Sequence, residues 1–475
     1  MAIESRIRSL IDGQDEPGGS VFTLRDKYLG TELAEVETAN AHNVTQAVAA
    51  ARRAFAGTVP PPHRRFAILS DAARLLEARR PLFSDTLVAE AGFTLSDAAS
   101  EIDRAILTLG LCAEQARQLH GDMVALDASP GQEKRIAFTM RTPIGIVCAI
   151  TPFNSPLNVV LHKIAPALAA GNAVIVKPSG HTPKTAVLLA RLLIDAGLPP
   201  GLIGVLHDQN GEAAQALLAE QDIGFYTFTG STRVGRLIQN AAGLRRTQLE
   251  LGSIASTIVC GDADLDLALP KIANAAFRKA GQVCTSVQRL YVQAPIYEDV
   301  LERIIAIAAA MPAGDPRDAK TRVGPMISED AAVRVESVVR QAALAGAEIR
   351  CGGQRSGAVH APTILVGTVA GMRVMDEEIF GPVLSVIPFT VLEEAVHGAN
   401  DTPYGLSVGV FTRDIGHALK AARTLRFGAV HINETSSARA DAMPFGGVKD
   451  SGFGREGPAY AIREYTEERL ITVTC

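Results

Sequence analysis

Residues 144–156 read IGIVCAITPFNSP, an almost wholly apolar run followed by a polar turn that is bounded by two prolines, Pro152 and Pro156. An apolar run of this length is typical of a strand that is buried on both faces of a parallel sheet. Further β-rich runs, separated by helical patterns, follow at residues 173–176, 203–206, 223–229 and 257–259. Strands that alternate with helices predict a doubly wound α/β sheet, whose ligands bind beyond the carboxyl ends of the strands.

The segments on either side carry other patterns. Apolar residues recur at helical spacing from residue 43 to residue 120, which predicts a helix-rich N-terminal region. A second alternation of helices and strands runs from residue 264 to about residue 432, with one helical pattern at residues 265–280, and indicates another α/β domain. Residues 123–142 read as a hairpin and residues 470–474 as a strand, and both are candidate edges for pairing with a partner subunit.

The composition excludes several classes of protein. Of the 475 residues, 46 are Lys or Arg and 51 are Asp or Glu, which gives a net charge of −5. This balance argues against binding to nucleic acid or to a membrane surface through bulk charge, and favours small molecules or a second copy of the chain as partners. Hydrophobic residues make up 47% and charged residues 20% of the chain, as in ordinary globular proteins.

The cysteines and the N-terminus point to a reducing compartment. The 6 cysteines show no Cys-x-x-Cys spacing and no cluster with histidines, so we expect neither a metal site nor a disulfide framework. Residues 1–12 lack the uninterrupted apolar core of a signal peptide, and no stretch approaches the roughly 18 apolar residues of a membrane-spanning helix. The sequence therefore predicts a soluble, cytoplasmic protein in which any functional cysteine acts alone.

Three residues are candidates for chemistry. Cys284 follows Gly281 and a helical stretch, where backbone amides can stabilise a thiolate; a small buried apolar residue is the ordinary alternative. Glu250 lies between two leucines, which raises the pKa of a buried carboxyl and suits a general base, although such a glutamate usually faces solvent. Asn154 lies between the two prolines, either to hold an oxyanion or to form an Asx turn.

Two segments at predicted strand ends are candidates for binding a phosphate. Lys177-Pro178-Ser179 ends one strand, and residues 228–235, FTGSTRVG, run from a strand into a helix. Amides at the start of a helix can hold a pyrophosphate where small residues allow close approach. The dinucleotide motif Gly-x-Gly-x-x-Gly is absent from this segment, so a purely structural turn is the alternative.

Short motifs along nearly the whole chain together resemble those of the aldehyde dehydrogenase superfamily. In order they are PFN at 152–154, KPS at 177–179, FTGS at 228–231, LELG at 249–252, GQVC at 281–284, EEIFGP at 377–382 and PFGGVKDSG at 444–452. The resemblance implies an α/β aldehyde dehydrogenase fold with a Rossmann-like cofactor domain, an α/β catalytic domain and a small β extension for oligomerisation. The implied boundaries are 1–122 with 143–251 for the cofactor domain, 252–447 for the catalytic domain, and 123–142 with 463–475 for the oligomerisation strands. A homodimer or homotetramer is expected.

The resemblance also implies a role for each candidate. Cys284 attacks an aldehyde, Asn154 and the Cys284 backbone amide hold the oxyanion, and Glu250 activates the water that releases a carboxylic acid. NAD or NADP is the implied cofactor, and the residues expected to bind it are Thr151, Pro152, Lys177, Ser179, Gly180, Gly230, Ser231, Leu251, Glu378 and Phe380. The cysteines left as structural residues are Cys112, Cys148, Cys260, Cys351 and Cys475.

The sequence departs from the family pattern at Gly180. NAD-preferring members often carry a glutamate there, whose carboxylate accepts hydrogen bonds from ribose hydroxyls and would repel the 2′-phosphate of NADP. Glycine removes that repulsion, so the choice between NAD and NADP stays open. Lys279, where asparagine is usual, and Ser253-Ile254, where Gly-Lys is usual, are further departures that touch no catalytic role directly.

Members that oxidise apolar aldehydes often carry aromatic residues or methionine at four positions that are all polar here. Three of them, Arg104, His162 and Arg439, are or can be cationic, and the fourth is Ser155. Each alone is ordinarily a solvated surface residue. Together they favour an anion site, because arginine matches carboxylate, sulfonate and phosphate geometry. We expect a short polar or anionic aldehyde, as in the lactaldehyde, phosphonoacetaldehyde and non-phosphorylating glyceraldehyde-3-phosphate branches. Val283, where phosphate-binding members often carry arginine, argues against a dianion.

The same motifs are compatible with two other functions. A CoA-acylating dehydrogenase would pass the acyl group to CoA rather than to water, and the presence of Glu250 speaks against it. A member without catalytic activity, kept as a structural or binding protein, is the second alternative. The joint presence of Cys284, Asn154, Glu250 and Glu378 speaks against that alternative.

Overall fold

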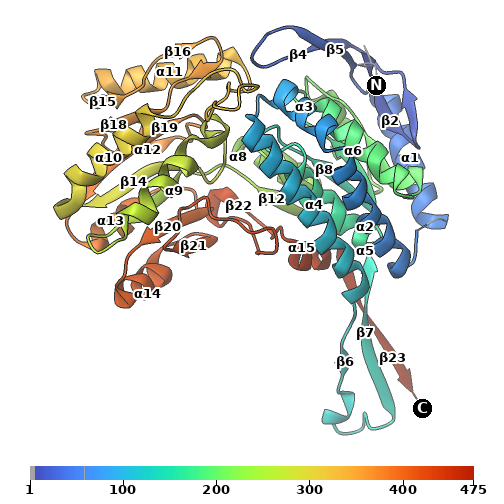
Figure 1. The fold of residues 1–475 in the computed structure, drawn as a ribbon. Helices are drawn as coiled ribbons and strands as arrows, with labels where there is room; N and C mark the ends of the chain where they lie inside the picture. Colours follow the sequence, from blue (N-terminus) through green and yellow to red (C-terminus); the bar gives the residue numbers. More distant parts are fainter. Residues whose placement is uncertain (1–5, 58, 475) are drawn as a thin grey trace.

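The computed structural model describes residues 6–57 and 59–474, and the strand predicted from residues 144–150 lies in the middle of the sheet of one of its two bodies (Figure 1). This strand, β8 (Ile146–Ile150), is buried along its whole length within an 8-stranded sheet. It begins at Ile146 rather than at residue 144 because Gly145, with φ of +125°, turns the chain between β8 and the strand before it. The strand order is β22 (Gly452–Phe453), β12 (Arg246–Glu250), β11 (Ile223–Thr229), β8, β9 (Ala173–Lys177), β10 (Ile203–Val205), β2 (Ser9–Ile11) and β3 (Gln14–Glu16).

The middle of this sheet is parallel, from β12 through β11, β8 and β9 to β10, whereas β22, β2 and β3 pair antiparallel at its two ends. The end strands were not predicted, because they are too short to carry an apolar pattern. One hydrophobic core joins the sheet to helices α1 (Ala41–Gly57), α2 (Pro62–Ala78), α3 (Arg80–Ala91), α4 (Leu95–Gln118), α5 (Asn158–Ala170), α6 (Pro183–Asp195), α7 (Glu212–Ala219), α8 (Thr232–Ala242) and α15 (Pro458–Glu464).

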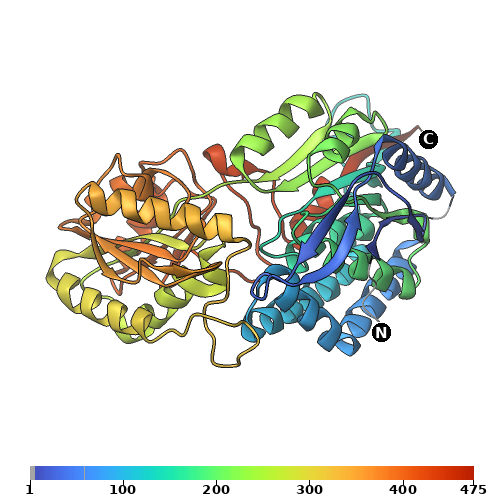
Figure 2. The same ribbon diagram turned by 90° about the horizontal axis from the view of Figure 1, so that it is seen from above.

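A second sheet of 7 strands forms the other body of the molecule, beside the first when seen from above (Figure 2). Its order is β15 (Glu348–Cys351), β18 (Thr363–Val366), β19 (Val383–Phe389), β14 (Val287–Gln293), β13 (Ala255–Val259), β20 (Ser407–Phe411) and β21 (Ala429–Ile432). Its helices are α9 (Leu265–Phe277), α10 (Tyr297–Ala309), α11 (Glu329–Leu344), α12 (Arg373–Asp376), α13 (Leu392–Asn400) and α14 (Ile415–Thr424). The predicted α/β class is thus confirmed in both alternating regions.

A three-stranded sheet forms an arm that projects away from the two bodies (Figure 1). Its strands are β6 (Met123–Val124), β7 (Arg135–Pro143) and β23 (Thr466–Thr474), and β7 lies between the other two. The predicted tail strand therefore begins earlier than residue 470 and pairs along the whole of β7. Two small sheets complete the fold, made of β1 (Arg6–Ile7), β4 (Val21–Arg25) and β5 (Glu32–Glu37), and of β16 (Arg355–Ser356) and β17 (Val359–His360).

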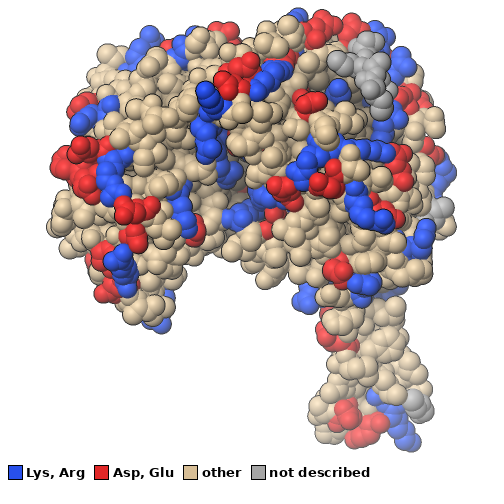
Figure 3. Space-filling model, in the orientation of Figure 1, with Lys and Arg blue, Asp and Glu red and all other residues tan. Residues whose placement is uncertain are grey.

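The surface in Figure 3 carries basic and acidic side chains interspersed over both bodies. Within residues 6–57 and 59–474, no helix is long and apolar enough to cross a membrane. The same part of the chain holds no group of His, Cys, Asp and Glu side chains with the geometry of a metal site. Four of the cysteines assigned a structural role are buried or half-buried free thiols, at positions 112, 148, 260 and 351; Cys475 lies outside the described residues.

Candidate active site

Cys284 is presented by a tight turn between α9 and β14. The helical pattern predicted to reach Ala280 ends at Phe277, because Lys279 and Ala280 adopt left-handed conformations with φ near +50°. Such conformations cost about 1–3 kcal/mol each for residues other than glycine and persist where the surroundings impose them. Gly281 is also left-handed, and a Cβ there would lie 2.2 Å from the carbonyl oxygen of Gly381. Close packing against Gly381, which lies just before β19 in the same body, therefore fixes the turn that carries the thiol.

Glu250 ends β12 at the carboxyl edge of the first sheet, with a side chain that is almost wholly buried. Burial, followed by the charge of Glu456, raises the pKa of Glu250 to about 7, and the charge of Lys163 opposes this. Its Oε1 has no hydrogen-bond partner among the described residues. The carboxyl is therefore poised to accept a proton near neutral pH.

Cys284 and Glu250 influence each other directly. Burial, then the charge of Glu250 and a hydrogen bond with it, raises the pKa of the Cys284 thiol well above its usual value, while the charge of Arg439 lowers it. In this state the thiol holds its proton and the carboxylate is the group placed to take it. A nucleophile and a base in hydrogen-bonding contact are the arrangement that covalent catalysis needs.

Asn154 lies in the turn after β8, where the sequence predicted it, and its side chain points to the Cys284 loop. Its Nδ2 donates to the carbonyl oxygen of Gln282 at 2.8 Å, which occupies one of the two amide hydrogens. The Asn154 carbonyl accepts from Lys279 Nζ at 3.0 Å, and that ammonium also binds Glu101 Oε2 at 2.8 Å. These contacts fix the amide and leave its second hydrogen for an oxyanion.

A cavity of about 340 Å³ opens beside the thiol, between the two bodies. Its wall includes Cys284 and Asn154 together with two of the predicted substrate-binding residues, Arg104 and Arg439. His162 does not line it, and neither does Glu250. The cavity thus unites the nucleophile, the amide and two arginines from positions far apart in the sequence.

His162 takes a different place from the predicted one, because it lies behind the cavity wall with 1% of its side chain exposed. Its Nε2 is 2.8 Å from Asp441 Oδ1, and the same carboxylate accepts two hydrogen bonds from Arg104, at 2.7 and 3.1 Å. Burial, followed by the charge of Arg439, lowers the pKa of His162, so the ring is neutral at pH 7. The structure therefore gives His162 no charge to offer an anion.

Arg439 is also paired, with Glu456 Oε2 at 2.8 Å. Glu456 Oε1 accepts from Lys163 at 2.9 Å, and both of these side chains are buried. Sequence reasoning missed Asp441, Glu456 and Lys163, because no motif marks them. The predicted cluster of positive charge is therefore largely compensated by carboxylates.

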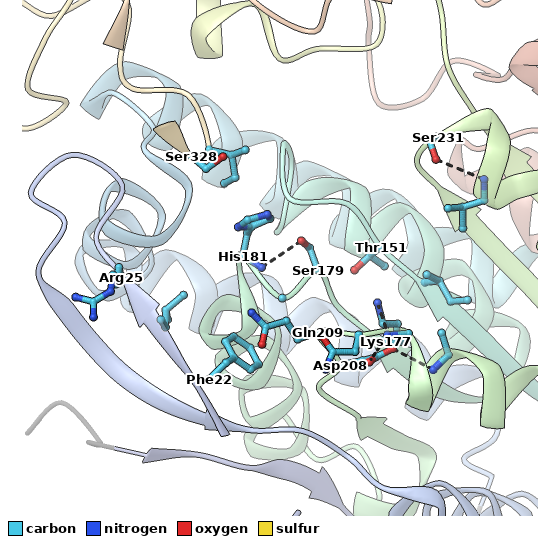
Figure 4. Close-up of a pocket in the computed structure, with 18 of the residues that line it drawn as sticks. Phe22, Arg25, Thr151, Lys177, Ser179, His181, Asp208, Gln209, Ser231 and Ser328 are labelled. Carbon is cyan, nitrogen blue, oxygen red and sulfur yellow. Dashed lines mark hydrogen bonds and ion pairs between the residues drawn. The ribbon is translucent and has the colours of Figure 1, made fainter. Parts of the chain in front are cut away.

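A second and larger cavity, of about 1070 Å³, lies at the carboxyl ends of β8, β9 and β11 (Figure 4). The predicted cofactor residues that line it are Thr151, Lys177, Ser179, Gly180 and Ser231. Those that do not line it are Pro152, Gly230, Leu251, Glu378 and Phe380. The cofactor prediction therefore divides into residues in this cleft and residues outside its lining.

Glu378 and Phe380 belong to the loop between α12 and β19 and lie nearer to the catalytic residues. Glu378 Oε1 accepts from the Ser253 amide at 3.1 Å, and burial raises the pKa of Glu378 to about 7, with the charge of Glu250 adding to the effect. Phe380 has φ of +51°, and its ring meets that of Phe153 edge to face at 5.9 Å. Both side chains are thus held firmly within reach of the catalytic region.

The cleft fits a dinucleotide on its own chemistry. The buried hydroxyl of Thr151 lines it without a hydrogen-bond partner among the described residues. α8 starts at the cleft, where Ser231 caps the helix by accepting from the Val234 amide at 3.4 Å, and first-turn amides remain for a phosphate. Gly180 brings no carboxylate, and its neighbour His181, drawn beside Ser179 in Figure 4, was not predicted to contribute. The pocket can therefore hold a nucleotide with or without a further phosphate.

A family model, sequence relatives and solved structures all match this chain over nearly its whole length. Residues 15–471 match the model of the aldehyde dehydrogenase family. The chain is 43% identical to 3-sulfolactaldehyde dehydrogenase of Priestia aryabhattai over 98% of its own length and 97% of the relative. Among solved structures, aldehyde dehydrogenase 21 of Physcomitrella patens in complex with the reaction product succinate matches at a TM-score of 0.96, with 32% identity and coverage of 99% and 98% of the two chains. Glyceraldehyde-3-phosphate dehydrogenase of Methanocaldococcus jannaschii complexed with NADP matches at 0.92, with 34% identity and coverage of 96% and 99%.

Proposed function

The chain belongs to the aldehyde dehydrogenase family, and from this premise we propose that it oxidises a short anionic aldehyde to the carboxylic acid with NAD or NADP, through a covalent intermediate on Cys284. The observation that carries the proposal is the cavity that Cys284 and Asn154 line together, with the buried Glu250 carboxyl near enough to the thiol to raise its pKa. A nucleophile, a base and an oxyanion donor are the groups that this chemistry requires.

Bond formation begins at the thiol. Glu250 accepts the proton as Cys284 Sγ attacks the aldehyde carbon, because its pKa near 7 keeps it partly ionised at neutral pH. The carbonyl oxygen becomes an oxyanion, which the free amide hydrogen of Asn154 and the backbone amide of Cys284 stabilise. The product of this step is a thiohemiacetal.

NAD⁺ or NADP⁺, when bound, supplies the hydride acceptor that turns the thiohemiacetal into a thioester. The residues that would hold it are those of the large cleft, with Thr151, Lys177 and Ser179 on one side and the start of α8 on the other. Glu378 and Phe380 would hold its reactive end, close to the catalytic residues. Relatives solved with NADP or with NAD support either form.

Release of the acid uses Glu250 a second time. Glu250 first releases to solvent the proton that it took from Cys284, and the regenerated carboxylate then takes a proton from a water molecule, whose oxygen attacks the thioester carbon. The carbon–sulfur bond breaks, the thiolate of Cys284 leaves, and the carboxylic acid forms. Glu250 can act in both steps because burial raises its pKa to about 7, an effect to which the charge of Glu456 adds and which the charge of Lys163 opposes.

An anionic substrate is supported by the arginines of the cavity and by the relatives. Arg104 and Arg439 both reach the cavity wall beside Cys284, and each is paired with a carboxylate behind it. The wall itself carries more cations than carboxylates, namely Arg104, Lys271, Arg278, Lys279 and Arg439 with Glu434. One relative is named for 3-sulfolactaldehyde, and a similar structure was solved with succinate, so both names refer to acidic compounds. A substrate with a carboxylate or sulfonate fits this setting.

We also infer that the arm pairs with a second copy of the chain. β23 forms an edge of the arm, and an edge strand offers unpaired backbone groups to another sheet. Large apolar side chains stand exposed along the arm, among them Met123, Ile136, Met140, Leu470 and Val473. Leu470→Asp should lower the particle mass measured by light scattering, and an unchanged mass would speak against the inference.

The proposal is tested by incubating the purified protein with short aldehydes and NAD or NADP. We expect about one equivalent of reduced cofactor, measured by its absorbance at 340 nm, for each equivalent of acid released. Mass spectrometry should identify the acid. Formation of an acyl-CoA only when CoA is added would instead favour a CoA-acylating enzyme. Absence of reduced cofactor with every aldehyde, together with failure of iodoacetamide to label Cys284, would favour a protein without catalytic activity.

A further inference from the structure

Lys279 lies in the turn that presents the thiol, and the family resemblance left it without a catalytic role. Its side chain is only 7% exposed, and its ammonium pairs with Glu101 Oε2 at 2.8 Å. Lys279 Nζ also donates to the carbonyl oxygen of Asn154 at 3.0 Å, and it lies 4.2 Å from the centroid of the Phe93 ring. An ammonium has three hydrogens, and here two oxygens and an aromatic face surround it. These partners fix the position of the lysine.

Glu101 holds the residues that follow Asn154. It lies on α4, with 1% of its side chain exposed. Its Oε1 accepts from Ser155 Oγ at 2.6 Å and from the Asn158 amide at 2.9 Å. Asn158 is the first residue of α5, so the carboxylate also satisfies an amide at the start of that helix. One carboxyl group therefore connects the turn after β8 to α4 and, through its other oxygen, to Lys279.

Hydrogen bonds around the oxyanion donor close into a ring that joins the two bodies. Asn154 Nδ2 donates to the carbonyl oxygen of Gln282, and the Gln282 amide donates to the carbonyl oxygen of Lys279 at 3.0 Å. The Lys279 ammonium donates to the Asn154 carbonyl, which completes the ring. Asn154 follows β8 of the first sheet, whereas the other two residues follow α9 of the second body. The placement of the amide relative to Cys284 therefore depends on the lysine.

The two charges of the pair are both withdrawn from water. Burial opposes ionisation of Glu101, yet the charge of Lys279 and the hydrogen bonds to the carboxylate bring the pKa of Glu101 below its usual value. Burial lowers the pKa of the Lys279 ammonium, and the charge of Glu101 opposes that shift. Removal of one partner of a buried pair is strongly destabilising, whereas removal of both charges together often costs little. Geometry and stability can therefore be separated by substitution.

We propose that the buried Lys279–Glu101 pair positions the Asn154 amide for the oxyanion that forms at Cys284. This inference rests on the proposed aldehyde oxidation, in which Asn154 is the side-chain oxyanion donor. Lys279 and Glu101 are positioning residues, because they act on the rate through the amide and not through contact with the aldehyde. A displacement of about 1 Å at such a donor can cost about 10²-fold in rate, as much as removal of the donor itself.

The first test is a double-mutant cycle between Lys279 and Asn154 in the full-length enzyme saturated with cofactor. The aldehyde is 4-oxobutanoate, and the readout is the rate constant of cofactor reduction in the first turnover, measured by stopped flow. Lys279→Met should lower the maximal rate constant at least about tenfold, and the aldehyde concentration that gives half of it should change less than about threefold. In Asn154→Ala the same substitution should cost less than about twofold, because the amide is already absent. A tenfold loss in both backgrounds would overturn the inference and leave aldehyde oxidation standing.

A second comparison separates positioning from folding. Lys279→Met leaves Glu101 buried without its partner and should lower the melting temperature, whereas Lys279→Met/Glu101→Gln removes both charges and should regain most of the loss. The rate constant should stay low in this double variant, because the contact with the Asn154 carbonyl is still missing. Recovery of the rate constant together with the melting temperature would give the pair a purely structural role and overturn the inference. The double variant also provides the rate measurement if Lys279→Met does not fold.

Asp103→Asn is the matched control, because it removes a carboxylate from the same helix. Asp103 pairs with Arg80 at the surface, and its side chain is 63% exposed. We expect this variant to keep the rate constant of the unsubstituted enzyme within about twofold. A tenfold loss would show that any change of charge on α4 reaches the oxyanion site, and would overturn the specific role of the Lys279–Glu101 pair. If the unsubstituted enzyme reduces no cofactor with 4-oxobutanoate or any other short aldehyde, the proposed function fails and the inference fails with it.

Discussion

The cofactor cleft and the catalytic cavity are built in opposite ways. The cleft is formed where neighbouring strands end, by short segments that each carry a local motif, such as residues 177–179 at the end of β9. The cavity is formed by side chains from distant segments, and the ion pair between Arg104 and Asp441 joins residues 337 positions apart. A binding site formed at strand ends can therefore be predicted from a short stretch of sequence. The net charge of a cavity cannot, because it depends on which distant carboxylates pair with its cations.

Removal of the nucleophile should have the largest effect, and it should change catalysis in the cavity without changing cofactor binding in the cleft. Cys284→Ala should abolish turnover because no covalent intermediate can form, while the cofactor should bind with its original affinity, as measured by calorimetry. Cys351→Ala, at a half-buried thiol in another part of the second body, is the control and should retain full activity. Loss of cofactor binding in Cys284→Ala would mean that cleft and cavity are not independent.

Loss of the base should have the next largest effect. Glu250→Gln should lower kcat by about 10³-fold, within the range for removal of a general base. The pKa of Glu250 is raised to about 7, so the activity of the unsubstituted enzyme should fall as the pH drops through 7 and the carboxylate takes up a proton.

The pKa of Glu378 is also raised to about 7, so the pH profile of Glu250→Gln is needed to distinguish the two carboxyls. In Glu250→Gln the residual activity should show little of that decline below pH 7. A pH profile of unchanged shape in the variant would assign the titration to another group.

Removal of the oxyanion donor should cost somewhat less. Asn154→Ala should lower kcat by about 10²-fold, because the amide stabilises charge that develops only during the reaction. The measurement is kcat and KM with one aldehyde, together with the cofactor dissociation constant as a control for folding. A rise confined to KM would indicate that Asn154 binds the aldehyde rather than its oxyanion.

The smallest effect concerns the cleft alone. Gly180→Glu should lower kcat/KM for NADP by about tenfold relative to NAD, because a carboxylate at this position would repel a 2′-phosphate. Gly180→Gln is the matched control, since it adds the same bulk without the charge. An equal loss with both cofactors in both variants would indicate crowding against the carbonyl of Asp208, which lies 3.1 Å from a Cβ at this position.

Much of the fold could be predicted from the sequence, and the reasons are local. β8 and β9 carry continuous apolar runs and β11 is rich in aromatic and β-branched residues, and their buried positions follow from these patterns. Short strands such as β2 and β12 were missed, because a strand of few residues or mixed polarity has no periodic pattern to detect. α9 was predicted too long, because the apolar spacing continues past Phe277 whereas the helical conformation of the backbone ends there.

The residues of the candidate site also differ in whether local sequence could predict them. Cys284, Glu250 and Asn154 lie in recognisable motifs, and the structure brings them together. The compensation of Arg104 and Arg439 could not be predicted, because Asp441 and Glu456 become their partners only through folding. The position of His162 was predicted wrongly for a related reason. Helical spacing predicts which residues lie on the same face of a helix, but not whether other side chains separate that face from a cavity.

The central claim is that the chemistry of this protein passes through a covalent intermediate on Cys284. The most direct measurement is mass spectrometry of Glu250→Gln after mixing with an aldehyde and cofactor. Without the Glu250 charge that raises its pKa, the Cys284 thiol can lose its proton to solvent, whereas the thioester has no base for its hydrolysis and should accumulate. The account predicts an added acyl mass on the peptide that contains Cys284 and on no other cysteine-containing peptide. An acyl group on a different cysteine, or reduced cofactor formed without any protein adduct, would contradict it.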